Sequence, residues 1–429
     1  MSDFLVLVTD DAVQRMREGG RWGQVTFQVS FPDNVGAVIA VSHGTGPVMP
    51  TPLKPVNHFL RSGDSQRGHR WFRVAPWVHT MWWRMRHIRD VMVPLNSFKD
   101  AVEGGWRSPS ADGAYVALTY SPDAPKRFPE VGVPELVAWW VTASGVYPAS
   151  LDIQVNDHGL SRLTEHWPSA QLADASIMLV GAGSIGGAAA DALASYGIGR
   201  LVLVDPDRLL SHNVVRHVAT AKSVGKLKVD VLKENLAEAW PATRVEPLAR
   251  DVITDANLIR PLLDRVDVLL CTADGVAARR VVSHLARRAQ IDAVLACVLA
   301  DGAIGEILRL RPWPDHGCLV CRRHALMADG SMDPEPGLDL GYGTGTTHRP
   351  MTAVGGDLHL VGQVAAKTSV ATILERRGHS DQKIFGEHAL IGLRPQVGWA
   401  PPFDLDHNNE IRWLPHQPPQ PGCPTCEPA

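Results

Sequence analysis

Short apolar runs alternate with helix-like segments through the middle of the chain. The runs Ile177–Val180, Leu201–Val204 and Val268–Cys271 are unbroken, which is typical of strands buried on both faces. Residues 187–196 are rich in Ala and Leu, and Val229–Trp240 carries apolar residues at helical spacing, so both segments predict helices. Strands that alternate with helices predict a mostly parallel, doubly wound α/β sheet.

The same pattern extends toward the C-terminus. Val245–Val252 and Val294–Val298 predict further strands, and Ala256–Leu263 predicts a further helix. In Asp357–Arg376 the apolar positions recur at helical spacing. This last segment therefore predicts a helix that packs on the sheet.

Residues 1–158 follow a different pattern. The expected elements are a strand and the start of a helix within residues 1–16, strands at Thr26–Phe31, Ala37–Val41 and Tyr115–Tyr120, and helices at Arg84–Val93 and Pro134–Val141. Eight tryptophans fall in this part of the chain, which favours a packed aromatic core. We expect a separate α+β domain that is large enough to fold alone.

Composition restricts the class of protein. The chain has 429 residues, 45% apolar and 20% charged, which suits two or three globular domains. Its net charge of −3 gives no electrostatic reason to expect a nucleic-acid partner. No apolar run reaches transmembrane length, and the N-terminus has an early Asp3 but no basic region. We expect a cytoplasmic protein with reduced thiols and no membrane partner.

Three glycines follow the first apolar run at the spacing of a nucleotide-binding turn. Gly181, Gly183 and Gly186 form GxGxxG, and the helix that follows would present its N-terminus to an anion. Asp205 ends the second run, where its carboxylate can accept a hydrogen bond from a ribose hydroxyl. The glycine spacing alone fits NAD, FAD and ATP equally well.

The residues after Asp205 favour a triphosphate over a dinucleotide. Asn213 and Arg216 form an NxxR loop, and Lys226 and Lys228 follow it. Attack on the α-phosphorus of ATP builds negative charge on the phosphates, which such cations stabilise. Asp274, just past the run that ends at Cys271, is a candidate ligand for Mg²⁺.

Four of the six cysteines form two CxxC pairs. The pairs are Cys318 with Cys321 and Cys423 with Cys426, and each lies beside turn residues. In a reducing compartment two such pairs predict one closed, structural zinc site with four cysteine ligands rather than disulfides. Cys271 and Cys297 end predicted strands and are interpreted as small core residues.

Together these motifs resemble the adenylation domain of the ThiF/MoeB/HesA family, which includes the ubiquitin-activating enzymes. The resemblance covers residues 159–429 and implies a Rossmann-like fold with the zinc site, in which Gly305–Leu310 begins later antiparallel strands. It also implies a homodimer and the use of ATP and Mg²⁺ to adenylate the C-terminal glycine of a ubiquitin-like protein.

The resemblance assigns a role to each matching position. These are the nucleotide loop at Gly181, Gly183 and Gly186, the ribose-binding acid at Asp205, the phosphate contacts at Asn213, Arg216 and Lys228, and the magnesium aspartate at Asp274. The carboxylate of the substrate attacks the α-phosphorus and pyrophosphate leaves. Positioning and charge stabilisation suffice for this step, so no general base is required.

The crossover segment, residues 322–356, departs from the family because it contains no cysteine. In ubiquitin-activating enzymes this segment carries the cysteine that accepts the activated protein. Three interpretations remain: hand-off of the acyl-adenylate to a sulfur donor, as in MoeB-like members, an oxyester on a hydroxyl, or transfer to Cys297. The hydroxyls near the family's cysteine position are Thr344, Thr346 and Thr347, with Ser331 nearby and His348 as the neighbouring base.

The sequence favours activation of a ubiquitin-like protein for a bacterial-type conjugation pathway, with a conjugating enzyme as a further partner. The alternatives are activation of a sulfur-carrier protein and adenylation of a peptide in natural-product synthesis. Residues 1–158 are interpreted as a degenerate adenylation-like half or as a domain that binds a partner. A NAD-dependent dehydrogenase would need neither the NxxR loop nor the paired cysteines, and a non-enzymatic scaffold would not need the nucleotide residues.

Overall fold

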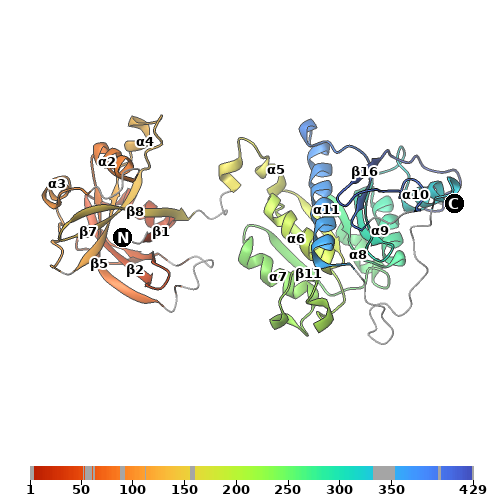
Figure 1. Ribbon diagram of the computed structural model, residues 1–429, viewed down its shortest axis with the longest axis horizontal. Coiled ribbons are helices and arrows are strands. Elements are labelled where there is room, and N and C mark those ends of the chain that lie inside the picture. Colours follow the sequence, from red (N-terminus) through yellow and green to blue (C-terminus); the bar gives the residue numbers. More distant parts are fainter. Residues whose placement is uncertain are drawn as a thin grey trace. The chain divides into compact units, whose positions relative to one another are not determined.

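A computed structural model describes residues 4–51, 53, 60, 63–86, 92–111, 113–154, 160–331, 353–394 and 398–427. The chain divides into two compact units, Met1–Gly159 and Leu160–Ala429, and Figure 1 shows the elements of each. Within the described residues, no helix combines the length and the apolar character needed to cross a membrane.

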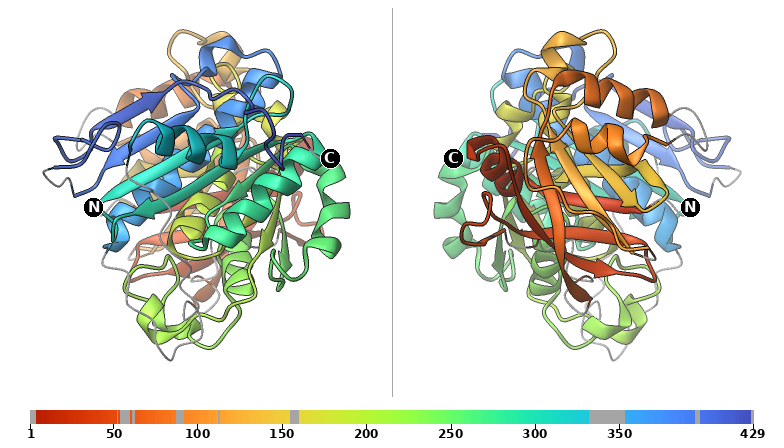
Figure 2. Two further views of the ribbon diagram at one scale, coloured as in Figure 1. Left: turned by 90° about the vertical axis from the view of Figure 1, so that its right-hand side faces the viewer. Right: turned by 90° about the vertical axis from the view of Figure 1, so that its left-hand side faces the viewer.

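The first unit is built around one sheet that closes on itself. Its elements are β1 (Leu5–Thr9), α1 (Asp10–Glu18), β2 (Trp22–Ser30), β3 (Val35–Val41), β4 (Met49–Pro50), β5 (Asp64–Arg73), α2 (Pro76–Arg86), α3 (Leu95–Asp100), β6 (Ala114–Tyr120), α4 (Ala124–Arg127), β7 (Leu136–Thr142) and β8 (Gly145–Gln154). The strand order is β1-β8-β7-β6-β5-β2-β3-β4, and β1 also pairs with β3. This additional pairing closes the ring of strands and leaves β1 and β3 without free edges. Figure 2 (right) shows the strands of this unit in red, orange and yellow.

Two large apolar clusters fill this unit, one on each face of the sheet, and a smaller one packs Leu60 against β1 and β3. In β2 every second residue is buried, so that Val25, Phe27 and Val29 enter one cluster together with α1. The other cluster packs α2 and α3 against the opposite face and includes the fully buried Trp139. The tryptophan-rich composition thus reflects core packing, as the sequence predicts.

Two helices predicted in this unit are wrong in whole or in part. The sequence predicts the start of a helix at residues 134–141, but Leu136–Thr142 form strand β7 between β6 and β8. Its β-branched and aromatic residues pack well in a pleated sheet, and this outweighs the helical signal of a proline at an early position. The helix expected at residues 84–93 instead begins at Pro76 and ends at Arg86, and residues 87–91 lie outside the described part.

The second unit contains an eight-stranded sheet with the order β11-β10-β9-β12-β13-β14-β15-β16. Its main elements are α5 (Ser169–Ala173), β9 (Ser176–Val180), α6 (Ser184–Tyr196), β10 (Arg200–Val204), α7 (Lys228–Ala239), β11 (Arg244–Leu248), α8 (Ala256–Ile259), β12 (Val268–Cys271), α9 (Val276–Ala289), β13 (Asp292–Leu299), β14 (Ile304–Leu310), α10 (Leu319–Ala328), α11 (Gly355–Arg376), β15 (His388–Gly392) and β16 (Ile411–Leu414). The strands from β11 to β13 are parallel, and β14, β15 and β16 are antiparallel. The mixed α/β fold, the antiparallel strand at residues 305–310 and the helix at 357–376 are confirmed.

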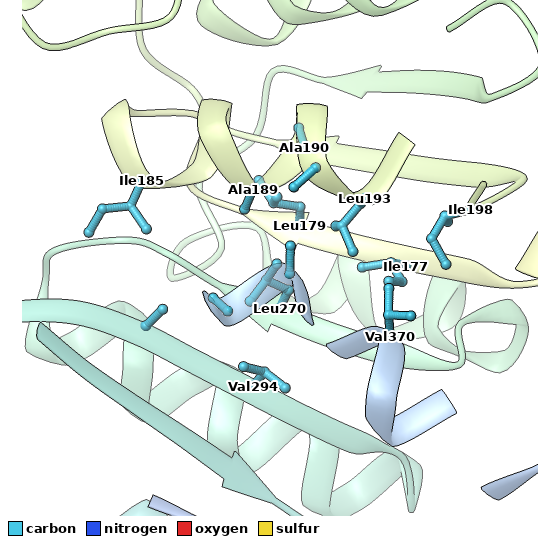
Figure 3. Packing of buried hydrophobic residues seen from close by; sticks show 14 of the residues in the cluster. Ile177, Leu179, Ile185, Ala189, Ala190, Leu193, Ile198, Leu270, Val294 and Val370 are labelled. Atoms are coloured by element: carbon cyan, nitrogen blue, oxygen red, sulfur yellow. The ribbon is translucent and has the colours of Figure 1, made fainter. Parts of the chain in front are cut away.

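Successive residues of the central strands enter two different cores. Ile177 and Leu179 of β9 pack against α6 and α11, as Figure 3 shows for Leu193 and Val370 of those helices. Met178 of β9 belongs to the cluster that contains α9 on the other face. Both faces of the parallel strands are therefore buried, which explains why their sequences are unbroken apolar runs.

Two boundaries near β11 differ from the sequence prediction. The strand expected at residues 245–252 ends at Leu248, because Asp251 accepts a hydrogen bond from the Ile253 amide and the chain turns toward α8. The helix expected at residues 256–263 is α-helical only to Ile259 and continues as a 3₁₀ helix. Pro261 lies at the start of that 3₁₀ helix and has no N–H to donate to the helical ladder.

The first unit should lose stability in mild acid through His79. This residue is fully buried, lies 2.7 Å from the Pro134 carbonyl oxygen through Nδ1, and burial lowers its pKa to about 4. Below pH 6.5 the unfolded chain binds a proton that the folded unit excludes, so the free energy of unfolding falls as the pH drops toward 4, by roughly 3 kcal/mol. His79→Gln keeps a donor for the Pro134 carbonyl but does not titrate. In urea titrations at pH 7 and pH 4, its free energy of unfolding should therefore fall by about 3 kcal/mol less than that of the wild type. Equal pH dependence in both proteins would contradict this assignment.

Candidate functional site

A cavity of about 440 Å³ opens where β9, β10, β11 and β12 end. Ligands bind at this edge in open α/β sheets because the loops after the parallel strands converge there. The residues that line it come from the loops after these four strands, from the ends of β9 and β10, and from the helices α6, α7, α9 and α11: Val180, Gly181, Gly183, Ser184, Ile185, Val204, Asp205, Pro206, Asp207, Arg208, Leu210, His212, Asn213, Arg216, His217, Lys228, Arg250, Asp251, Val252, Thr272, Ala273, Asp274, Gly275, Ala278 and Leu358. The structure thus brings together Gly181, Gly183, Asp205, Asn213, Arg216, Lys228 and Asp274 from the sequence prediction.

The three glycines of the turn have different reasons for lacking a side chain. Gly181 has a φ of +96°, and a Cβ atom there would lie 2.7 Å from the Ala273 nitrogen. A Cβ at Gly186 would clash with the Gly181 carbonyl oxygen, so helix α6 packs closely on the turn. Around Gly183 no atom lies within 4 Å of the position of a Cβ, and Gly183 lines the cavity. That space lets a ligand approach the backbone at the N-terminus of α6.

Asp205 braces this turn from the end of β10. Its Oδ2 accepts a hydrogen bond from the Ala182 amide at 2.7 Å, and its Oδ1 accepts one from the Asp207 amide at 2.8 Å. Burial raises the pKa of this carboxyl, and Lys228 and the two amides oppose the rise. Each carboxylate oxygen still has lone-pair capacity for a ribose hydroxyl.

The two lysines named from the sequence have different surroundings. The Nζ of Lys228 lies 2.8 Å from Asp207 Oδ2, and this lysine lines the cavity. Lys226 does not line it and instead pairs with Glu234 at 2.7 Å on the exposed surface. Asp207 is absent from the sequence prediction, although its position two residues after Asp205 places it in the same loop.

The NxxR loop is held by its own side chains and by His217. Asn213 Oδ1 accepts a hydrogen bond from the Leu210 amide at 2.9 Å. Arg216 is the cationic residue of this loop, and it lines the cavity. The buried His217 accepts the Ala219 amide at Nδ1, so Nε2 donates to the Ala182 carbonyl oxygen at 2.8 Å. Burial lowers the pKa of His217 and keeps it neutral. No sequence pattern indicates this role.

The formal charges in the cavity cancel. The carboxylates that line it are Asp205, Asp207, Asp251 and Asp274, and the cations are Arg208, Arg216, Lys228 and Arg250. A site with no net charge binds a triphosphate well only if a cation enters with it. Asp274, between the end of β12 and the start of α9, is a suitable oxygen ligand for that Mg²⁺ ion.

The two CxxC pairs meet in a second place, away from the cavity lining. The Sγ atoms of Cys318 and Cys423 are 3.5 Å apart, those of Cys321 and Cys426 are 3.7 Å apart, and all four lie within 4.8 Å of one another. A tetrahedral zinc ion with Zn–S bonds of about 2.3 Å places its sulfur ligands about 3.8 Å apart. The four buried thiols therefore fit the predicted zinc ion, which would tie the C-terminal tail to α10.

The candidate acceptors fall into two groups. Cys297 is 3% exposed, and burial raises its pKa to about 12, although Arg279 Nη1 lies 3.0 Å from its sulfur. Such a thiol is a poor nucleophile at neutral pH. The hydroxyls and the base expected in the crossover segment, Thr344, Thr346, Thr347 and His348, lie outside the described residues. Ser331 is described, and its Oγ donates to the Pro401 carbonyl oxygen at 2.8 Å.

The second unit is a mixed α/β fold with a cavity at the ends of its parallel strands, and comparison with known proteins identifies the family. The model of the ThiF family matches residues 160–384, more than half of the chain. The chain therefore belongs to the ThiF family, which confirms the resemblance inferred from its motifs.

Individual relatives match shorter stretches. The chain is 28% identical over 152 residues to the sulfur carrier protein ThiS adenylyltransferase of Escherichia coli, covering 35% of this chain and 59% of that protein. It is 31% identical over 150 residues to the tRNA threonylcarbamoyladenosine dehydratase of E. coli (35% and 54%), and 25% identical over 169 residues to ubiquitin-like modifier-activating enzyme 5 of Drosophila virilis (37% and 42%). The chain thus spans about half the length of these curated relatives.

Among solved structures, that of E. coli MccB with ATP aligns with a TM-score of 0.44 and 20% identity, covering 60% of this chain and 68% of MccB.

The purified protein should contain one equivalent of zinc. Replacing Cys423 with Ser removes one thiolate and should abolish stoichiometric zinc and lower the melting temperature, because the metal ties the C-terminal tail to the domain. Elemental analysis and thermal unfolding measure both effects. Cys271→Ser, at a buried cysteine outside the cluster, is the control and should retain zinc. Full zinc content in Cys423→Ser would contradict the assignment.

Proposed function

We propose that the second unit adenylates the C-terminal carboxylate of a protein or peptide, using ATP with Mg²⁺. One observation carries this proposal: the glycine turn, Asp205, Arg216, Lys228 and Asp274 all line the same cavity. This set combines a backbone cradle for phosphates with two cations and a carboxylate for the metal. Membership of the ThiF family supports the same reaction.

The residues of the cavity act by positioning and by charge. The turn and the N-terminus of α6 hold the phosphates, and Asp205 holds the ribose. Asp274 would hold a Mg²⁺ ion, which would supply the positive charge that the cavity lacks. The substrate carboxylate is ionised at neutral pH, attacks the α-phosphorus, and displaces pyrophosphate. Arg216 and Lys228 stabilise the charge that grows on the phosphates, so no side chain has to remove a proton.

Asp207 forms an ion pair with Lys228 that the sequence did not reveal and that nucleotide binding must break. Its carboxylate holds the Lys228 ammonium at 2.8 Å. Phosphate oxygens must compete with this carboxylate for the ammonium, so nucleotide binding turns Lys228 away from Asp207. The ion pair thereby holds a largely buried lysine, with 12% of its side chain exposed, near its site of action.

The substrate we favour is a ubiquitin-like protein with a C-terminal glycine, activated for conjugation. The names of two relatives, a sulfur-carrier adenylyltransferase and a ubiquitin-like modifier-activating enzyme, support a small protein as substrate. A sulfur-carrier protein and a natural-product peptide are the alternatives. For the first unit we propose partner binding, since its closed ring of strands differs from the open sheet of the adenylation unit. We also propose a homodimer, which light scattering will test.

Removing either phosphate-binding cation should abolish adenylation. Lys228→Ala and Arg216→Ala should each lower ATP–pyrophosphate exchange, in the presence of a ubiquitin-like partner, by roughly 100-fold or more, because charge on the leaving group loses a stabilising contact. Lys226→Ala is the matched control, since Lys226 pairs with Glu234 outside the cavity, and it should exchange at the wild-type rate. Exchange that survives Lys228→Ala would count against the proposed site.

The chemistry of the acceptor can be tested by intact mass. With ATP and a partner, an oxyester on the crossover segment predicts an adduct that resists thiols, is cleaved by hydroxylamine, and persists in Cys297→Ala. An adduct that thiols cleave and that is lost in Cys297→Ala would make Cys297 the acceptor, against its burial. Partner-dependent exchange without an adduct would instead favour direct hand-off. Where the hydroxylamine-sensitive adduct does form, its loss in Thr344→Val or Thr347→Val would identify the hydroxyl.

A further inference from the structure

Arg216 depends on its backbone for its position. Among the described residues its guanidinium has no hydrogen-bond or ion-pair partner, although it lines the nucleotide cavity. Its amide donates to the Asn213 carbonyl oxygen at 3.0 Å, within the loop itself. The contacts of the Arg216 carbonyl, which belongs to the following peptide group, therefore help to set where the charge of Arg216 lies.

The N-terminal end of α11, residues 355–359, contacts the Arg216 backbone on its carbonyl side. His359 Nε2 lies 2.9 Å from the Arg216 carbonyl oxygen, and since a carbonyl only accepts, the imidazole donates. A Cβ atom at Gly355 would lie 3.2 Å from the Arg216 Cα and 3.4 Å from the Val215 carbonyl oxygen. Leu358, between these two residues in sequence, itself lines the nucleotide cavity.

This end of α11 is itself held from behind. A Cβ at Gly302, in the turn between β13 and β14, would clash with the Cβ of Ala353, two residues before the helix. Gly302 has a φ of +84°, which a glycine adopts without strain. The start of α11 is thus in contact with the sheet on one side and with the phosphate loop on the other.

We propose that His359 is a positioning residue for Arg216, and that residues 355–359 of α11 form the support that aims the guanidinium at the triphosphate. This inference rests on the proposed adenylation for its kinetic readout. His359 touches no reacting atom. It acts only through the backbone of Arg216, so its effect must disappear when the guanidinium is absent.

The test uses the full-length protein and a double-mutant cycle. We expect His359→Ala to lower the kcat of ATP–pyrophosphate exchange about ten-fold and to weaken Mg·ATP binding about three-fold, as the loss of one hydrogen bond predicts. His359→Gln, which can still donate to the carbonyl, should recover most of both losses. In an Arg216→Ala background, His359→Ala should have no further effect. Gln363→Ala, an exposed residue one turn along α11, should behave as wild type.

A second pair of variants tests the close contact without touching a polar group. Gly355→Ala places a methyl group against the Arg216 backbone, whereas Gly356→Ala meets no atom within 4 Å. Both substitutions raise the helix propensity of α11, so any stabilisation of the helix that they share cancels when the two variants are compared. We expect Gly355→Ala to lower kcat and Gly356→Ala to leave it unchanged.

The outcomes separate this inference from the proposed function. Equal effects of His359→Ala in the wild-type and Arg216→Ala backgrounds would overturn it, as would wild-type kinetics in both His359→Ala and Gly355→Ala. If the wild-type protein shows no ATP–pyrophosphate exchange with any partner tested, the proposed function fails. The cycle is then run on Mg·ATP affinity by calorimetry, where the same non-additivity supports the positioning role and additivity overturns it.

Discussion

The backbone of Ala182 is the point on which the cavity at the ends of the parallel strands depends. Its N–H donates to the buried Asp205 carboxylate, and its carbonyl accepts from the neutral, buried His217. Asp205 follows β10 and His217 follows the NxxR loop, so the backbone of this one residue joins the glycine turn to both ends of the segment between them. The left-handed backbone of Gly181 is maintained by these two contacts and by close packing on Ala273. Loss of either partner would leave a buried polar group unsatisfied, which costs more than the hydrogen bond itself contributes.

A buried ionic network connects β14 with α10 and β15. Glu306 on β14 accepts hydrogen bonds from Arg323 on α10 and lies 2.9 Å from His388 on β15. Burial alone would raise the pKa of Glu306, but Arg323 holds it well below its usual range. Removing one member of such a network leaves an uncompensated charge in the interior, so the set behaves as a unit. Arg323 lies two residues after Cys321, and the thiol cluster and this network therefore fix the same helix.

The sequence predicted what local patterns encode. Unbroken apolar runs marked β9, β10 and β12, the glycine spacing marked the turn, and the CxxC pairs marked the thiol cluster. Strand β7 was missed because Pro134 suggested a helix, whereas pairing with β6 and β8 decides its structure. Asp207, His217 and His359 were missed for a different reason. Each acts through a contact with a residue distant in sequence, such as the 143 positions between Arg216 and His359, and such contacts leave no local signature.

The cysteines limit the chemistry that can follow adenylation. All six are buried, four in the mutual cluster and two at the ends of β12 and within β13. Burial raises the pKa of Cys271 to about 11 and that of Cys297 to about 12, so neither offers a thiolate at neutral pH. A thiol acceptor within this chain would need to break the cluster or to open the sheet. If the proposed adenylation occurs, the acyl-adenylate is therefore best received by an oxygen nucleophile of residues 332–352 or by a separate molecule that reaches the cavity. Both routes leave the cysteine cluster and the parallel strands undisturbed.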